Sequence, residues 1–167
     1  MEKGVLVPRP ETEIVVETAL RRLEDRPSLH SLADLGCGSG CIGLSLINEL
    51  TELRLWAVDI SPKACEVTLK NAVAFGAQDR VKIENKRVEE WNPDMQFDCI
   101  VANPPYIAEY DTRVQASVRK HEPAEALFAA EDGFESLRSW SQWAFGHLGP
   151  KGNFVCEIGA NQSRLMQ

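Results

Sequence analysis

An apolar run that ends in Asn-Pro-Pro-Tyr is the part of the chain whose residue types point most directly to chemistry. Residues 97–102 can form one buried strand, and Pro104 and Pro105 cannot continue it, because neither has an N–H for the ladder. Asn103 therefore stands at the carboxyl end of a strand, where open α/β sheets bind their ligands. Its side-chain carbonyl, fixed beside backbone carbonyls and the aromatic Tyr106, suits a planar –NH2 group. The segment predicts chemistry on an amide or amine nitrogen.

A glycine-rich segment, Asp34-Leu35-Gly36-Cys37-Gly38-Ser39-Gly40, follows another predicted strand. Glycines allow a tight turn and let a ligand approach the backbone, and the next helix offers its free N–H groups. Asp59 ends the following strand, where a carboxylate can accept both hydroxyls of a ribose. Residues 38–43 also match G-x-G-x-x-G. This pattern is weak evidence by itself, but it keeps a dinucleotide as an alternative cofactor. The segment predicts a nucleotide-type cofactor.

The elements that must position these residues alternate between strands and helices. Strands are expected at 29–35, 54–58, 81–84, 97–102 and 153–158, and helices at 11–23, 41–50 and 134–147, with another that follows Ser61 and stops at Gly76. Ser61 is the expected N-cap of that helix and Pro62 its first residue. Residues 107–132 are expected to be loop-rich. Such βαβ alternation predicts an α/β fold with a parallel sheet and helices on both faces.

Hydrophobic spacing predicts which helix faces are buried. The first helix is expected to bury a stripe made of Ile14, Val15, Ala19, Leu20 and Leu23. The helix after Ser61 is expected to bury Cys65, Leu69, Ala72 and Val73. Trp140 and Trp143 lie three residues apart on a predicted helix, which favours two core residues, and the three histidines show no ligand spacing.

Composition narrows the class of protein. The 167 residues, 44% hydrophobic and 26% charged, are enough for one domain with a substantial core. No apolar run approaches the roughly 20 residues of a membrane span, and the first residues lack the layout of a signal peptide. The net charge of −7 gives no help toward a nucleic-acid backbone. Five cysteines indicate buried reduced thiols in a cytosolic protein, and the close pair Cys37 and Cys41 has no histidine partners, so no metal site is expected.

Taken together, these motifs resemble the class I S-adenosylmethionine-dependent methyltransferases, and among them the glutamine-N5 protein methyltransferases. The residues that carry the resemblance extend over nearly the whole chain: residues 7–13 (Val-Pro-Arg-Pro-Glu-Thr-Glu), 34–40, 58–61, 103–106, 122–123, 126–127 and 157–159. Many methyltransferases share the glycine segment, and enzymes that methylate amino groups, including adenine N6, share Asn-Pro-Pro-Tyr. Residues 7–13 are the most specific to the glutamine group, and 10–13 with 157–159 lean toward its release-factor branch.

The resemblance implies a Rossmann-like sheet in strand order 3-2-1-4-5, S-adenosylmethionine as cofactor, and a glutamine in a release factor as acceptor. It implies that the Asn103 side-chain oxygen and the Pro104 carbonyl accept from the substrate –NH2, and that Tyr106 packs on the amide. The implied cofactor-binding residues are Asp34, Gly36, Cys37, Gly38, Gly40, Asp59, Ile60 and Asn103. The implied substrate-binding residues are Arg9, Glu11, Thr12, Asn103, Pro104, Pro105 and Tyr106.

Three features depart from the family pattern. The family usually has an acidic residue just after the third strand, but residues 86–88 are Lys-Arg-Val here, and Glu89 follows too late for a clean match. Residues 129–133 have alanine and glutamate where the family tends toward glycine. Relative to the family, the chain looks cut ahead of its first helix and after Gly159, where a closing pair of strands is expected. We expect residues 1–28 to form an extended segment and helix, and 29–167 the cofactor-binding core with its last strand at an edge.

Other functions stay open at this point. The acceptor can be a ribosomal-protein glutamine, or an adenine amino group in RNA or DNA. The G-x-G-x-x-G match fits a nucleotide-binding dehydrogenase, and the departures fit a non-catalytic relative that keeps the pocket. The leading hypothesis is a cytoplasmic methyltransferase that acts on a protein glutamine.

Overall fold

Five parallel strands form the central sheet in the order β3-β2-β1-β4-β7. The structure is a computed structural model that describes residues 5, 9–23, 30–105, 107–108, 128–129 and 134–159. The strands are β1 (Ser31–Leu35), β2 (Arg54–Asp59), β3 (Val81–Asn85), β4 (Phe97–Ala102) and β7 (Leu148–Cys156). The expected strand order and the parallel Rossmann-like α/β sheet are confirmed. Among the described strands, β7 lies at one edge.

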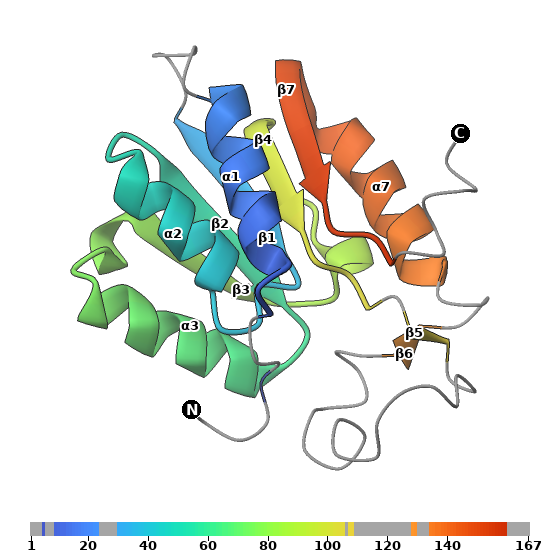
Figure 1. Cartoon of the computed structure of the whole chain (residues 1–167), viewed down its shortest axis with the longest axis horizontal. Helices are drawn as coiled ribbons and strands as arrows, with labels where there is room; N and C mark the ends of the chain where they lie inside the picture. The colour runs from blue at the N-terminus through green and yellow to red at the C-terminus, as the bar shows by residue number, and fades with distance from the viewer. Residues whose placement is uncertain are drawn as a thin grey trace.

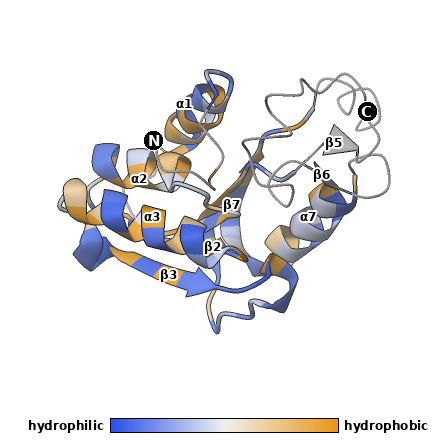
Figure 2. Ribbon diagram, turned by 90° about the horizontal axis from the view of Figure 1, so that it is seen from below, coloured by the Kyte–Doolittle hydropathy of each residue, from blue (hydrophilic) through white to orange (hydrophobic). Residues whose placement is uncertain are grey.

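Helices cover both faces of the sheet, as expected (Figure 1). The helices are α1 (Thr12–Leu23), α2 (Cys41–Glu49), α3 (Pro62–Ala74) and α7 (Glu135–His147). Alternate strand residues point to opposite faces: Leu32 joins a core with α1 and α2, whereas Ala33 joins a core with α7. Figure 2 shows α1–α3 and α7 on opposite sides of the sheet, with hydrophobic and polar stretches alternating along α3.

The buried face of α3 differs from the expected stripe. Leu69 is 51% exposed and Val73 is 58% exposed, so those two residues of the prediction were wrong. Ala72 is buried as predicted, and Ala64 and Thr68, spaced four residues apart on the same face, are buried with it, beside Val67. Small side chains fit there because α3 lies close to the glycine segment, where Thr68 Oγ1 donates to the Gly38 carbonyl at 3.1 Å. Packing distance, rather than hydrophobicity, selected this face.

Helix α1 shows a smaller difference of the same kind. Val15, Ala19 and Leu23 are buried as predicted, and Leu20 packs partly against the same core. Ile14, by contrast, is 63% exposed, so its assignment to the buried stripe was wrong. The positions i, i+4 and i+8 that are buried define a narrower stripe than the sequence spacing suggested.

The caps of α3 agree with the sequence. The Ser61 side chain accepts from the Ala64 N–H at 3.3 Å, and Pro62 occupies the first helical position. After the helix, Gly76 adopts a left-handed φ of 64° and the Ala77 N–H donates to the Ala72 carbonyl at 2.8 Å. This is the glycine C-cap arrangement that satisfies the last carbonyls of a helix.

The last strand begins earlier than predicted. Strand β7 starts at Leu148, five residues before the expected strand 153–158, so it includes the Gly-Pro-Lys-Gly segment. The segment pairs with β4 through a register irregularity between Phe97 and Cys99, and Lys151 adopts a φ of 63° there. Of the expected loop-rich region 107–132, the structure describes a short parallel pairing of β5 (Ile107–Ala108) with β6 (Phe128–Ala129).

The core on the α7 face is built around aromatic rings. Trp143 stacks on Trp91 with ring centroids 4.9 Å apart, and its indole N–H donates to the Trp91 carbonyl at 2.7 Å. Phe97 lies against both rings. The expectation that Trp143 belongs to the core is confirmed. In the described part of the chain, no helix is long and apolar enough to cross a membrane.

Candidate functional site

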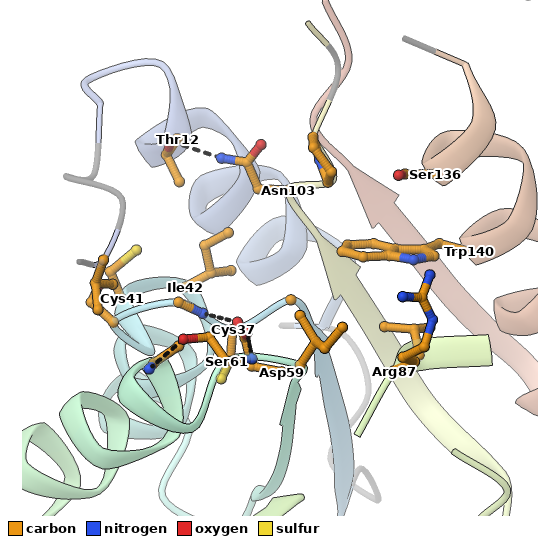
Figure 3. Close-up of a pocket in the computed structure, with 18 of the residues that line it drawn as sticks. Thr12, Cys37, Cys41, Ile42, Asp59, Ser61, Arg87, Asn103, Ser136 and Trp140 are labelled. Atoms are coloured by element: carbon orange, nitrogen blue, oxygen red, sulfur yellow. Dashed lines mark hydrogen bonds between the residues drawn. The ribbon is translucent and has the colours of Figure 1, made fainter. Parts of the chain in front are cut away.

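A pocket opens at the carboxyl ends of β1, β2 and β4 (Figure 3). Its lining combines the glycine segment, the end of β2, the residues after β3 and β4, and the first turns of α1 and α7. The residues that line it are Val5, Thr12, Gly36, Cys37, Gly38, Ser39, Cys41, Ile42, Asp59, Ile60, Ser61, Ala64, Arg87, Val88, Glu89, Asn103, Pro105, Ser136 and Trp140. The glycine segment and Asn103, which the sequence singled out, lie 63 or more positions apart in the chain. They share one cavity because parallel strands end at the same edge of the sheet.

The glycine segment forms a tight turn at this edge. The N–H groups of Gly36 and Cys37 donate to the Val58 carbonyl at 2.9 and 3.1 Å, which ties the turn to β2. Gly36 has a φ of 67°, and a Cβ there would lie 2.5 Å from a ring carbon of Trp140. Glycine is therefore required at position 36 both for its backbone conformation and for the close approach of the indole.

Asp59 holds the turn from the end of β2 and faces the pocket. One carboxylate oxygen accepts from the Gly38 N–H at 2.9 Å, and the other accepts from the Ser61 N–H at 2.8 Å. Both carboxylate oxygens therefore act as hydrogen-bond acceptors at the edge of the pocket, which is the chemistry that ribose hydroxyls require. The position of Asp59 fits the ribose contact that the sequence predicted.

Asp34 lies behind the glycine segment, outside the pocket lining. Its side chain is buried, and it accepts from the Gly43 N–H at 3.0 Å. Burial is the main cause that raises the pKa of Asp34 to about 7, with the Gly43 bond opposing it and the charge of Asp59 adding to it. Asp34 thus connects β1 to the start of α2. Because it lies outside the pocket lining, its direct contact with a cofactor stays a prediction.

The acceptor side of the pocket is built around Asn103. Its side-chain nitrogen lies 3.5 Å from Thr12 Oγ1, and the Thr12 hydroxyl donates to Glu157 Oε2 at 3.0 Å. Pro105 lines the pocket, whereas Pro104 is buried behind it. Tyr106 lies outside the described residues. Of the three expected substrate-binding residues near the first helix, Thr12 lines the pocket, and Arg9 and Glu11 do not.

Three residues that the sequence analysis did not assign to the site close its opposite end. Glu89 Oε1 accepts from the Trp140 indole N–H at 3.1 Å and from the Ser139 hydroxyl at 2.9 Å. The Arg87 guanidinium lies 3.9 Å from the other Glu89 oxygen, and Figure 3 places it on the Trp140 side of the pocket. Trp140 lines the site and also packs, partly buried, against the core cluster that contains Trp143, so the prediction that paired the two tryptophans in the core holds for Trp140 in part.

Glu89, which follows β3 too late for a clean match to the family pattern, nevertheless lines the pocket. The short 3-10 helix η2 (Val88–Glu90) tightens the chain after β3 and turns this carboxylate to the pocket. A 3-10 turn of three residues was not readable from the sequence, because its hydrophobic pattern is too short to be periodic. An acidic residue three positions beyond Lys86 was the only available signal.

The five cysteines lie in the described part of the chain, where each is buried or partly buried. All five cysteines are reduced. Burial raises the pKa of Cys37 well above its ordinary value and also raises that of Cys41, so the two pocket thiols are held in the protonated form. Within the described residues, no three His, Cys, Asp or Glu side chains are placed to hold a metal ion.

The fold is similar to that of solved methyltransferase structures. A ribosomal protein L11 methylase from Lactobacillus delbrueckii subsp. bulgaricus superposes with a TM-score of 0.64 over 97% of this chain and 67% of that one, at 18% identity. An S-adenosylmethionine-dependent methyltransferase from Clostridium acetobutylicum superposes with a TM-score of 0.61 over 90% of this chain and 52% of that one, at 15% identity. At these identities the likeness shows the fold: the Rossmann-like fold of class I methyltransferases.

The family follows from the sequence match. Residues 12–130 match the model of the methyltransferase small domain, and the chain belongs to that family. The curated relatives include release factor glutamine methyltransferases from Koribacter versatilis, 38% identical over 157 residues, and from Clostridium acetobutylicum, 37% identical over 169 residues. These alignments cover 93% and 98% of this chain but 55% and 58% of the relatives. The chain therefore spans little more than half the length of these relatives.

Proposed function

We propose that the chain is the catalytic core of an enzyme that transfers a methyl group from S-adenosylmethionine to the side-chain amide nitrogen of a glutamine in a peptide chain release factor. The observation that carries the proposal is the single pocket in which Asn103 lies across from the glycine segment and Asp59. The names of the curated relatives support the same reaction and the same acceptor. A protein of this kind works where translation takes place, in the cytoplasm.

The pocket offers a suitable group for each part of the cofactor. Gly36 and Gly38 would meet the methionine portion, because both line the pocket and both have a left-handed φ that favours glycine. A Cβ at Gly36 would in addition lie 2.5 Å from the Trp140 ring. Asp59 would accept from the ribose hydroxyls. Trp140, held by Glu89, would give the base an aromatic surface beside Arg87. Glu89 would then take the place of the acidic residue that the family usually has just after the third strand.

S-adenosylmethionine, when bound, supplies a sulfonium methyl that needs no further activation, so the protein's task is to position the acceptor. A carboxamide nitrogen is a poor nucleophile, because its lone pair is delocalised into the carbonyl. The Asn103 side-chain oxygen would accept from the substrate N–H and stabilise the positive charge that develops on nitrogen. The Pro104 carbonyl and the ring of Tyr106, as expected from the family pattern, would complete the contacts and orient the lone pair.

Titration calorimetry with S-adenosylmethionine, followed by methyl transfer from radiolabelled cofactor, tests the proposal in two separable steps. We expect the chain to bind the cofactor, and Asp59→Ala to weaken that binding by about tenfold or more, as expected for loss of charge-assisted hydrogen bonds. Labelled methyl is then expected in a release factor, and a release factor whose acceptor glutamine is changed to alanine serves as the blank. Label in a ribosomal protein, RNA or DNA instead would overturn the acceptor assignment, and no cofactor binding by the folded chain would overturn the whole proposal.

A further inference from the structure

We propose that Thr12 and Glu157 are positioning residues that fix which way the Asn103 side-chain amide faces. The inference rests on the proposed function, in which the Asn103 oxygen accepts from the substrate –NH2. The three residues come from different parts of the chain: Thr12 begins α1, Asn103 follows β4, and Glu157 follows β7. Hydrogen bonds join their side chains at the acceptor side of the pocket, where Figure 3 shows Thr12 and Asn103.

The direction of the hydrogen bonds determines the orientation. An ionised carboxylate can only accept, so the bond of 3.0 Å between Glu157 Oε2 and Thr12 Oγ1 uses the one hydroxyl proton of Thr12. Thr12 Oγ1 then presents a lone pair to Asn103, and only the –NH2 group of the Asn103 amide can donate a hydrogen bond to it. The structure has this arrangement, with Asn103 Nδ2 3.5 Å from Thr12 Oγ1 and the Asn103 oxygen pointing away from Thr12 (Figure 3).

If the Asn103 side-chain amide were reversed, both its oxygen and its –NH2 would face groups with which they cannot form a hydrogen bond. Its oxygen would face the lone pair of Thr12, and its –NH2 would face the –NH2 of the acceptor, so two donors would meet. Oxygen and nitrogen have nearly the same size, so packing alone does not distinguish the two orientations. The chain of donors from Asn103 through Thr12 to Glu157 does distinguish them, because it ends on a group without a proton.

The surroundings keep this chain of bonds in place. Thr12 is only 5% exposed, which limits competition from water. The backbone N–H of Glu157 donates to the Ala102 carbonyl at 2.9 Å, directly before Asn103, so the end of β7 is joined to the end of β4. Any shift of Glu157 would therefore also move the strand end that carries Asn103. Thr12 acts through Asn103 rather than on the substrate itself.

The first test uses Thr12→Val, which removes the hydroxyl at constant shape, and Thr12→Ser, which keeps it. Thr18→Val is the matched control, since it makes the same chemical change on the same helix outside the pocket lining. We expect Thr12→Val to lower kcat on the release factor by about tenfold or more, the usual scale for a misaligned acceptor. The dissociation constant of S-adenosylmethionine and the melting temperature are expected to stay close to those of the unchanged chain, and Thr12→Ser to restore most of kcat. Loss of kcat in both Thr12 variants together with loss of folding would show a purely structural role and overturn the proposal.

The second test needs no activity, so it separates this inference from the proposed function. In protein labelled with 15N-asparagine, the side-chain –NH2 signals of Asn103 are identified by their loss in Asn103→Asp. We expect these signals to shift in Thr12→Val and in Glu157→Ala, and to stay in place in Thr12→Ser and in the control Glu13→Gln. Unchanged signals in Thr12→Val would overturn the inference even if the enzyme methylates a release factor. Shifted signals in a chain that methylates nothing would support it while the proposed function fails.

Discussion

The buried carboxylate of Asp34 accepts a hydrogen bond from the backbone N–H of Gly43, at 3.0 Å, and so joins the middle of β1 to the first turn of α2. The same contact explains why position 43 is glycine, because a Cβ there would lie 2.9 Å from the Asp34 oxygen and 2.7 Å from Leu55. Asp34, which the sequence resemblance assigned to the cofactor, thus holds the glycine segment between β1 and α2 in its conformation.

The raised pKa of Asp34 predicts a pH dependence of stability. The carboxyl group has an ordinary pKa of 3.8 in the unfolded chain and one of about 7 in the folded chain, chiefly through burial. Between these values the folded state keeps a proton that the unfolded state has lost, so the free energy of unfolding falls as pH rises from about 4 to about 7. The contribution is fully present below pH 4. The slope is at most about 1.4 kcal/mol per pH unit.

Urea unfolding of the chain and of Asp34→Asn at several pH values across this window measures the effect. The asparagine oxygen can still accept from Gly43, and it does not titrate. We therefore expect the curve of the variant to fall less steeply with pH than that of the unchanged chain. Parallel curves for the two proteins would show that Asp34 does not titrate in this range.

Alanine at position 36 is expected to be much more destabilising than alanine at position 76. Both glycines have a left-handed φ, of 67° and 64°, which costs a side chain about 1–2 kcal/mol. At Gly76 the new Cβ would meet nothing within 4 Å, whereas at Gly36 it would lie 2.5 Å from the Trp140 ring. We expect this overlap to add about 1–3 kcal/mol.

Chemical denaturation of Gly36→Ala and Gly76→Ala gives the two costs directly. The double variant Gly36→Ala with Trp140→Ala should recover the overlap term and keep the backbone term. An equal loss for the two glycine variants would mean that Trp140 does not press against the turn.

Replacement of the two tryptophans of α7 by phenylalanine is expected to change different properties: stability for Trp143 and cofactor affinity for Trp140. Trp143→Phe leaves the Trp91 carbonyl without its 2.7 Å donor in a buried aromatic core, which costs about 1–3 kcal/mol of stability. Trp140→Phe loses a bond to the exposed Glu89 at the pocket, so its main effect is expected on cofactor affinity. Melting temperatures and calorimetric titrations of both variants check this; a larger stability loss in Trp140→Phe would contradict it.

Removing the cap of α3 should cost stability while it leaves the backbone contact of Ser61 with Asp59 in the pocket intact. Ser61→Ala loses the side-chain bond to the Ala64 N–H, which is worth about 0.5–2 kcal/mol at an N-cap. The Ser61 backbone N–H still donates to Asp59, so cofactor affinity is expected to change little. Ser61→Asp, which restores an N-cap acceptor, should recover most of the loss in urea unfolding. No difference between the alanine and aspartate variants would contradict the capping role.

The sequence by itself determined the elements, their order and the two halves of the site. Strand 97–102 was expected with the bounds that the structure has, because an apolar run ended by two prolines allows no other reading. The caps at Ser61 and Gly76 were equally local, since each depends on side-chain or backbone chemistry within one turn. Resemblance to known methyltransferases added the strand order, and parallel strand ends then required Asp59 and Asn103 to meet.

Only the tertiary structure decided which side chains each element turns inward. Distance to the glycine segment, not hydrophobicity, selected Thr68 over Leu69 on α3. Trp140 and Trp143 satisfy the same spacing rule, yet Trp143 is buried in the core whereas Trp140 packs against that core and also lines the pocket. The link from Thr12 through Asn103 to Glu157 joins residues up to 145 positions apart, so no local pattern could show it. Local chemistry fixes where the chain bends and stops, whereas long-range packing fixes what each side chain meets.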